Sequence, residues 1–439
     1  MNPAPPPSPL AEARPTDSGE RLMLLDTLRG FALCGVFISN TFFWFSGRIF
    51  LPRAELEALF ANGTVIDKAL LPIVSMLVTG RFITIFSFLF GLGFAVQLGR
   101  AEARGASLTG LYARRLAVLF GIGMSHLVLI WYGDILSSYA LLGGWLLLFR
   151  KREDRTVLWW ALGLIFMGPI LVALVHKMPQ LLAATPEAAA ALAKAEMERS
   201  AALRAEVLPT FQTGGWWAIV KAGLYFFRSE FLLAMGLNLP VVFGRFLLGY
   251  YAGRRRLFHD AEQNLAFFRR LFFWALGLGL VTSGVGAVLQ QLFIRKILNP
   301  ETLPTWVPFT MQPIRTMGEV AIAATYVSGI TLLFHKAAWQ KVLVLLAPVG
   351  RMALTNYLCQ SILSVLVFNG FGLGLFGKVK PLMPVLYCLG VFSVQVVVSH
   401  LWLSRFRFGP AEWVWRSLTY GKAQPMRQET GPVQPALAP

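Results

Sequence analysis

His126 and Asp134 are two residues whose types and spacing fit proton-transfer chemistry. They stand eight positions apart, and Gly133 marks a short turn between the two apolar runs that carry them. A carboxylate that bonds one imidazole nitrogen orients the ring, and the other nitrogen can then act as a general base near neutral pH. The orienting group in this interpretation is Asp134 or a hydroxyl such as that of Tyr139. Asp134 also has a simpler alternative role, as the cap of the helix that it begins.

Four arginine side chains lie inside or at the edge of apolar runs. A charged group at bilayer depth costs roughly 2.5 to 3.5 kcal/mol on insertion scales, so such residues usually face a partner or a water-filled cavity. We therefore expect paired or functional positions for Arg29, Arg81, Arg245 and Arg351.

The first apolar run carries a polar stripe. Asp26 and Arg29 are three residues apart, within reach of each other on one helical face. Asn40 lies eleven residues after Arg29, about three turns at 3.6 residues per turn, and so returns to the same stripe. The stripe either lines a channel for a substrate or cofactor, or consists of an intrahelical ion pair and a packing amide.

Two further groups of polar residues fit ligand binding. Arg114 and Arg115 begin an apolar run, and guanidinium groups at that place suit the phosphates of an anionic ligand. Asn356 and Gln360 share a helical face at a spacing of four residues. Hydrogen bonding between helices, worth on the order of 1 kcal/mol per bond in membranes, is the plain alternative for these two amides.

The elements that must position these residues are apolar along almost the whole chain. The 439 residues are 56% hydrophobic and only 14% charged, whereas soluble domains carry roughly a quarter charged residues. A net charge of +18 would suggest nucleic acid in a soluble protein, but the apolar excess favours a membrane and excludes a nucleic-acid partner. Basic loops then indicate topology and contact with anionic lipid headgroups. The three cysteines lack CxxC spacing, so neither a disulfide framework nor a metal site is expected.

The hydropathy pattern predicts an all-α, polytopic transmembrane helical bundle of about ten spans. A spanning helix needs roughly 20 apolar residues. The segment 65–80 is apolar but short, and we expect it to be interfacial or re-entrant. The predicted spans are 22–46, 78–99, 111–131, 134–149, 157–176, 231–251, 271–293, 317–334, 343–368 and 383–404.

Counts of basic residues on alternate sides predict that both termini are cytoplasmic. With that orientation, 22 lysines and arginines fall on the cytoplasmic side and 14 on the opposite side. The expected organisation is a disordered tail (1–21), an N-terminal membrane half (22–176), an extracytoplasmic loop (177–230), a C-terminal membrane half (231–404) and a cytoplasmic aromatic and charged cap with a disordered tail (405–439).

The loop 177–230 is the sizeable segment outside the predicted spans. Pro186 to Val207 is rich in alanine and charge, which predicts a solvated helix. Trp216 to Phe227 places aromatic residues beside cations, which is typical of an interfacial helix. The loop is either a spacer between the two membrane halves or a lid over an outward-facing pocket.

Several motifs together resemble family 418 of the domains of unknown function. The resemblance runs from Arg21 to Lys422, and its last two motifs are highly specific. The motifs are Leu25, Asp26 and Leu28 to Gly30, FSFLFGLG at 86–93, Arg114, Arg115, Gly123 and His126, Gly133 to Leu136 with Tyr139, GRMALTNY at 350–357, and GPAEWVWRSLTYG at 409–421.

At superfamily level the pattern is similar to membrane acyltransferases such as heparan-glucosaminide acetyltransferase and the acyltransferase-3 proteins. Those relatives use an acyl-CoA from one side of the membrane to modify an acceptor on the other. They share the start that falls here on Asp26, Arg29 and Gly30. This chain departs from the acyltransferase-3 pattern at Asn40, where that pattern has a histidine.

The residues and the resemblance together predict a multi-pass acyltransferase of the cell inner (plasma) membrane. Acyl-CoA is the expected co-substrate, no cofactor is expected to be bound permanently, and the acceptor is a small molecule, a glycan or a lipid. Arg114 and Arg115, with Arg351 or Arg29, would hold the phosphates, and His126 would deprotonate the acceptor. A transporter for a small metabolite is the alternative, and a membrane protein without turnover is a third. The sequence does not identify the acceptor within these classes, the acyl chain or the oligomeric state. The predicted site comprises the catalytic residues His126 and Asp134 and the binding residues Asp26, Arg29, Asn40, Arg81, Arg114, Arg115, Tyr139, Arg351, Asn356 and Gln360.

Overall fold

Helices form nearly all of the regular structure in the computed structural model, which describes residues 23–103, 109–294, 297–298 and 306–428. These residues contain no strand, and one isolated bridge joins Phe406 to Arg427. The predicted all-α class is confirmed. The tails 1–21 and 429–439 lie outside the described residues. The helices are α1 (Met23–Asn40), α2 (Arg53–Ala61), α3 (Val65–Leu77), α4 (Arg81–Ala103), α5 (Thr109–Leu129), α6 (Leu136–Trp145), α7 (Asp154–Leu181), α8 (Pro186–Thr213), α9 (Trp216–Phe226), α10 (Leu232–Arg254), α11 (Leu265–Ile294), α12 (Val307–Phe334), α13 (Ala337–Leu343), α14 (Ala347–Arg351), α15 (Ala353–Phe368), α16 (Leu382–Arg405) and α17 (Pro410–Tyr420).

Seven helical stretches in the described residues are long and apolar enough to cross a membrane. A further pair, Ala337–Arg351 and Ala353–Phe368, forms one span if its 77° bend is a break within the membrane. Eight of the ten predicted spans correspond to these stretches. The other two correspond to α5 and to a shorter apolar helix, Leu136–Phe149, so the count of ten stays a prediction. The chain is a multi-pass integral membrane protein.

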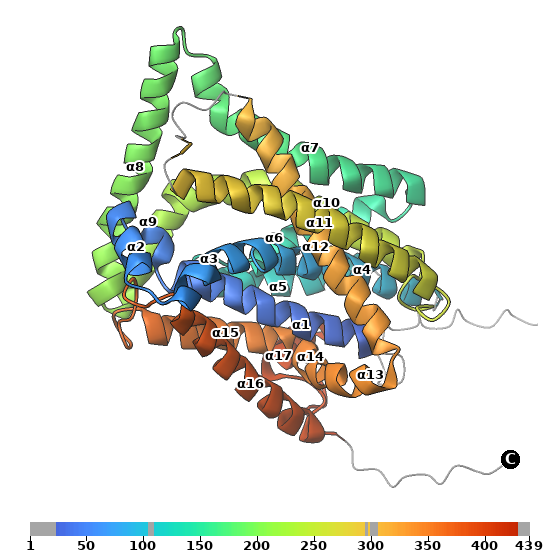
Figure 1. Ribbon diagram of the computed structural model, residues 1–439. Coiled ribbons are helices and arrows are strands. Elements are labelled where there is room, and N and C mark those ends of the chain that lie inside the picture. The colour runs from blue at the N-terminus through green and yellow to red at the C-terminus, as the bar shows by residue number, and fades with distance from the viewer. Residues whose placement is uncertain (1–22, 104–108, 295–296, 299–305, 429–439) are drawn as a thin grey trace, which may run out of the picture.

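The bundle is built around α1, which lies between α4 on one side and α14 to α16 on the other (Figure 1). Glycines let these backbones meet. A Cβ at Gly30 would stand 2.2 Å from the carbonyl oxygen of Leu346, and one at Gly350 would stand 1.9 Å from that of Asp26. A Cβ at Gly91 of α4 would stand 1.8 Å from the carbonyl oxygen of Phe246 on α10. Such close approach of apolar helices needs small residues at the interface.

The segment 65–80 forms α3 and its junction with α4. Thr64 begins α3 with a capping box, in which its hydroxyl accepts from the backbone N–H of Asp67 and the Asp67 carboxylate accepts from that of Thr64. Gly80 ends the junction with a φ of +80°, a conformation that favours glycine. The apolar helical stretch then runs from Val65 to Ala103, and the interfacial or re-entrant character expected of 65–80 stays a prediction.

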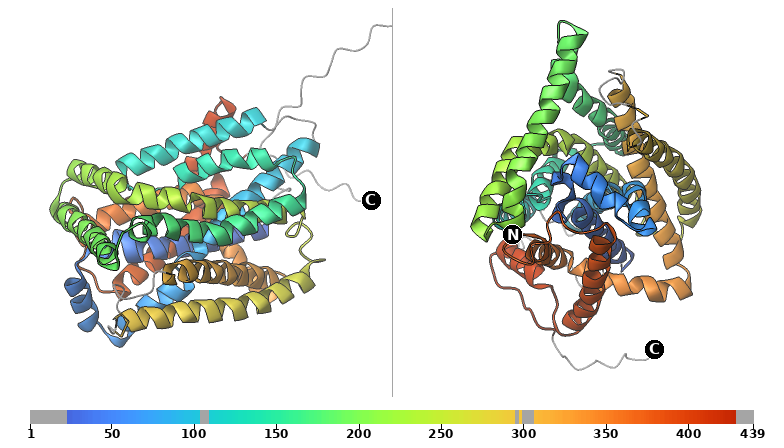
Figure 2. Two further views of the ribbon diagram at one scale, coloured as in Figure 1. Left: turned by 90° about the horizontal axis from the view of Figure 1, so that it is seen from above. Right: turned by 60° about the vertical axis from the view of Figure 1, so that its left-hand side comes forward.

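The predicted helices of the loop 177–230 are present as α8 and α9. Helix α8 begins at Pro186 as expected and continues to Thr213, six residues beyond the predicted end. The outer end of α7 and the first part of α8 form a hairpin that projects from the bundle (Figures 1 and 2). The second part of α8 instead buries Val207, Leu208 and Phe211 in an aromatic cluster with α9. The division of the chain into domains remains a prediction.

Candidate functional site

A cavity of about 340 Å³ lies among α1, α4, α5, α6, α14, α15 and α17. We call it the main cavity. Ile83 and Arg100 both line it and stand seventeen residues apart on α4, so it extends about 25 Å along that helix at 1.5 Å per residue. It is therefore long and narrow, as a site for an elongated ligand would be.

One end of the main cavity is cationic. Six arginines and two carboxylates line the cavity, which leaves a formal excess of four positive charges. The remaining wall is largely apolar and includes Leu33, Phe90 and Leu119. A cavity with these two parts suits an amphipathic ligand that has an anionic head. The arginines, which define the cationic end, are Arg29, Arg100, Arg115, Arg351, Arg407 and Arg416, and the carboxylates are Asp26 and Glu412.

A second cavity of about 180 Å³ lies beyond the opposite end and is lined by Asn40, Trp44 and Gly133 among others. Four residues line both cavities and form the wall between them: Val36, Ile83, Ile135 and Tyr357. The polar stripe of α1 thus contributes to both hollows, with Asp26 and Arg29 in the main cavity and Asn40 in the second. Asp26 and Arg29 are also the ion pair that their spacing predicts, with Nη1 2.7 Å from Oδ1.

His126 and Asp134 meet in the structure as a buried pair. The Nδ1 atom of His126 lies 3.0 Å from Oδ1 of Asp134, and Oδ2 of Asp134 accepts a 2.7 Å hydrogen bond from the backbone N–H of Ser137. Asp134 therefore both orients the imidazole and caps α6, which were the alternatives for it. Gly123 makes this possible, because a Cβ there would stand 2.4 Å from the Ser137 nitrogen.

The buried pair of His126 and Asp134 lies behind the wall between the two cavities. His126 is 1% exposed and its Nε2 has no hydrogen-bond partner among the described residues. Its ring centroid is 5.2 Å from that of Tyr357, which lines both cavities. His126 and Asp134 line neither of these two cavities. The rings of Tyr357, which lines both cavities, and of Trp131, which lines the second, pack against His126.

Helix α17 closes the cationic end. The guanidinium of Arg115 lies 4.1 Å from the ring centroid of Trp415, whose Nε1 donates a 2.8 Å hydrogen bond to the carbonyl oxygen of Arg115. Glu412 accepts from the backbone N–H groups of Leu354 and Thr355 at 2.7 and 3.2 Å and so caps α15 from a distance. Burial raises the pKa of the Glu412 carboxyl above its ordinary value, although these hydrogen bonds act to lower it.

The other predicted binding residues lie in different surroundings. Tyr139 lines the main cavity and shares a 2.7 Å hydrogen bond with Ser87. Arg114 is exposed and lies 3.5 Å from the carbonyl oxygen of Thr419. Asn356 donates to Val349 and Ser399, and Gln360 donates to Gln395 at 2.8 Å. These two amides join α15 to α14 and α16, as the packing alternative predicts, and line neither cavity.

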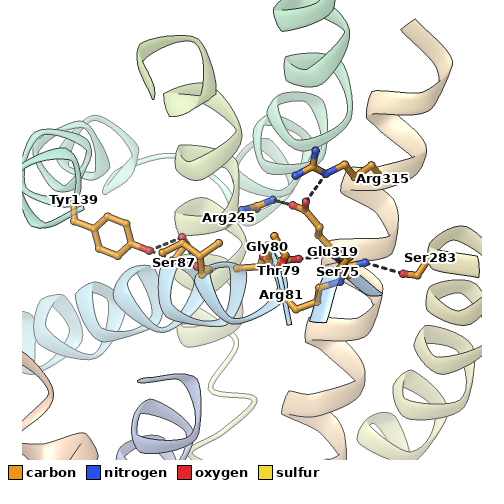
Figure 3. A network of polar contacts seen from close by, with 12 residues as sticks. Ser75, Thr79, Gly80, Arg81, Ser87, Tyr139, Arg245, Ser283, Arg315 and Glu319 are labelled. Carbon is orange, nitrogen blue, oxygen red and sulfur yellow. Dashed lines mark hydrogen bonds and ion pairs between the residues drawn. The ribbon is translucent and has the colours of Figure 1, made fainter. Parts of the chain in front are cut away.

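Arg81 belongs to a separate polar network (Figure 3). It donates to the carbonyl oxygens of Ser75 and Thr79 and to Oγ of Ser283. Beside it, Glu319 pairs with Arg245 at 2.7 Å and with Arg315 at 3.2 Å. These contacts join α3, α4, α10, α11 and α12. Neither cavity is lined by Arg81, Arg245 or Glu319, although Gly80, which packs against Glu319, lines the second. Arg245 therefore has the partner that its apolar surroundings led us to expect.

We expect Glu319→Gln to destabilise the protein strongly. The change leaves two arginines without their carboxylate, and breaking a buried ion pair costs roughly 3 to 5 kcal/mol. Thermal unfolding in detergent should show a clearly lower midpoint than wild type. Glu196→Gln, on the exposed part of α8, is the control and should leave the midpoint unchanged. Equal midpoints for wild type and Glu319→Gln would show that the network contributes little stability.

Sequence comparison places the site in a family. Residues 252–422 match the family model described as "Protein of unknown function (DUF418)". Over 96% of its length the chain is 35% identical to the whole of "Uncharacterized protein YxaH" from Bacillus subtilis (strain 168). The chain belongs to the DUF418 family. It is also 28% identical, over 94% of its length, to 99% of "Uncharacterized protein YeiB" from Escherichia coli (strain K12).

The segment that matches the DUF418 model carries part of the site. Arg351, Tyr357 and Glu412 fall within residues 252–422, whereas His126 and Asp134 precede them. The main cavity thus joins side chains of the matched segment to side chains of the N-terminal helices. The two relatives align with 96% and 94% of the chain. Their similarity therefore includes both the matched segment and the N-terminal helices.

Proposed function

We propose that the protein is an inner-membrane acyltransferase that moves an acyl group from cytoplasmic acyl-CoA to an acceptor on the other side. The observation that carries the proposal is the main cavity, whose cationic end and apolar body match the two parts of an acyl-CoA. The second cavity, across a thin wall beside His126, supplies the place for an acceptor.

The charge and the length of the main cavity support an acyl-CoA as the donor. Its 3′-phosphate and diphosphate carry roughly four negative charges at neutral pH, and the cavity lining has a formal excess of four positive charges. A cavity of about 150 Å³ binds benzene, so 340 Å³ holds roughly 14 non-hydrogen atoms, about two thirds of an acetyl-pantetheine arm. The thioester end of that arm enters the cavity, and the nucleotide stays at the cationic end.

The transfer itself needs one base. Nε2 of His126 takes the proton from the acceptor hydroxyl or amine as that atom attacks the thioester carbonyl carbon. The tetrahedral intermediate then collapses, the C–S bond breaks, and the CoA thiolate receives the proton from the imidazolium. Asp134, bonded to Nδ1, fixes the tautomer that leaves Nε2 as the acceptor and stabilises the imidazolium.

We expect acyl-CoA to stabilise the purified protein against heat. A ligand that binds only the folded state adds about 2.7 kcal/mol at a hundred times its dissociation constant. Acetyl-CoA at micromolar levels should therefore raise the unfolding midpoint, whereas ATP at the same concentration should raise it much less because it lacks the pantetheine arm. No shift with acetyl-CoA, or an equal shift with ATP, would contradict an acyl-CoA site.

A transporter for a small metabolite is the second candidate, because two cavities that face each other across a thin wall also suit alternating access. It predicts uptake of a solute into proteoliposomes in the absence of any acyl donor. Consumption of thioester by the same preparation, without solute uptake, favours the enzyme.

A further inference from the structure

Two buried polar atoms beside the wall between the cavities have no hydrogen-bond partner among the described residues. They are Nε2 of His126 and the hydroxyl of Tyr357, which lies close to the backbone of Ile135 but makes no hydrogen bond of normal geometry with it. The two side chains belong to residues that are 1% and 7% exposed, and their ring centroids are 5.2 Å apart. A buried polar group without a partner costs about 1 to 3 kcal/mol, and native structures keep few of them. Two such atoms in neighbouring rings therefore indicate where polar groups of a ligand lie.

Tyr357 is the polar member of the wall. The other three residues that line both cavities, Val36, Ile83 and Ile135, have aliphatic side chains. A thioester carbonyl that reaches the wall from the main cavity therefore meets one side-chain hydroxyl there. Tyr139, which also lines the main cavity, is already bonded to Ser87.

The backbone around Tyr357 is fixed by contacts that leave its hydroxyl unused. Glu412 caps the N-terminus of α15. The neighbouring Asn356 is held by Val349 and Ser399. Packing of the ring against His126 adds a further constraint. A hydrogen-bond donor held in place in this way requires little reorganisation when charge develops beside it.

We propose that Tyr357 is a catalytic residue of the acyl transfer. Its hydroxyl donates a hydrogen bond to the thioester carbonyl oxygen and stabilises the negative charge that forms there when the acceptor attacks. His126 takes the acceptor proton, and the proton passes to the CoA thiolate when the C–S bond breaks. Tyr357 keeps its own proton throughout. This inference rests on the proposed function and adds to it the group that binds the oxyanion.

The test compares two tyrosine-to-phenylalanine variants. Tyr357→Phe removes the hydroxyl and keeps the ring that packs on His126. Tyr250→Phe is the matched control, because the Tyr250 hydroxyl is also buried without a partner among the described residues but lines neither cavity. Purified wild type and both variants are supplied with acetyl-CoA and a membrane extract as the source of acceptor, and release of free CoA is measured over a range of donor concentrations.

We expect Tyr357→Phe to lower kcat by roughly 10²- to 10³-fold, the usual cost of removing one oxyanion donor. KM for acetyl-CoA should stay within about twofold of wild type, because the donor's phosphates bind elsewhere. Tyr250→Phe should match wild type, and both variants should show the wild-type thermal shift with acetyl-CoA, which verifies folding.

Other outcomes of this experiment contradict either the role of Tyr357 or the proposed acyltransferase function. Wild-type turnover with an unchanged kcat in Tyr357→Phe overturns the role of Tyr357 and leaves the acyltransferase standing. An equal loss in both variants attributes the effect to packing and likewise overturns that role. A wild-type protein that releases no CoA overturns the proposed function, and the role of Tyr357 falls with it.

Discussion

Replacement of His126 by alanine is expected to lower the rate of acyl transfer by roughly 10²- to 10⁴-fold, the usual contribution of a general base. The imidazole is held by Asp134 through Nδ1, and its Nε2 has no partner among the described residues. Nε2 is therefore the atom available to accept a proton. Donor binding should not change, because the cationic end lies at the far end of the main cavity.

Asp134→Asn keeps the imidazole of His126 in place but removes the carboxylate that bonds to it. The asparagine oxygen can still accept from the backbone N–H of Ser137, but its amide cannot stabilise an imidazolium. We expect a large loss of kcat with an unchanged KM for the donor.

His335→Ala is the matched control for His126→Ala, since His335 ends α12 with its Nδ1 2.8 Å from the carbonyl oxygen of Thr331. It should transfer acyl groups at the wild-type rate. Acyl transfer by His126→Ala at the wild-type rate would rule out His126 as the base.

The second large effect is expected at the cationic end, where Arg351→Gln should weaken acyl-CoA binding by about 10- to 100-fold. A hydrogen bond to a charged group contributes about 1.5 to 3 kcal/mol, and each 1.4 kcal/mol is a factor of about ten in affinity. The Nε of Arg351 is buried without a partner among the described residues, although the side chain lines the cavity. Binding is measured by titration of the purified protein with acetyl-CoA.

A donor without phosphates shows whether the lost positive charge is what weakens acyl-CoA binding in Arg351→Gln. S-acetylpantetheine lacks the nucleotide, so wild type and Arg351→Gln should turn it over with the same KM. Arg269→Gln, an exposed position on α11, should bind acetyl-CoA as wild type does. If Arg351→Gln binds acetyl-CoA normally, or loses affinity equally for both donors, the arginines do not hold the phosphates.

Contacts made over short stretches of chain could be predicted from the sequence. Asp26 and Arg29 share one turn of a helix, and His126 and Asp134 are joined by a tight turn, so few conformations separate them. The helical class followed from apolar runs of roughly 20 residues, the length that a membrane-spanning helix needs. Prediction succeeded where the chain itself limits the distance between two side chains.

Contacts between distant segments could not be predicted in the same way. Glu319 and Arg245 are 74 residues apart, and only the packing of α12 on α10 brings them together. Arg100 and Arg407 stand at helix ends, where basic residues also serve as topology signals, and their convergence depends on where those helices end in space. The position of Tyr357 follows from the 77° bend between α14 and α15, which a pattern of apolar residues does not reveal.

The central claim is that an acyl group passes from a donor at the cationic end to an acceptor in the second cavity. Its most direct test determines on which side of the membrane acetyl-CoA must be supplied. Radiolabelled acetyl-CoA, which does not cross membranes, is added to inverted and to right-side-out vesicles from cells that produce wild type or His126→Ala. We predict that label becomes bound to wild-type inverted vesicles and stays near background in the other three preparations. Equal labelling of inverted wild-type and His126→Ala vesicles, or labelling of right-side-out vesicles instead, would contradict the account.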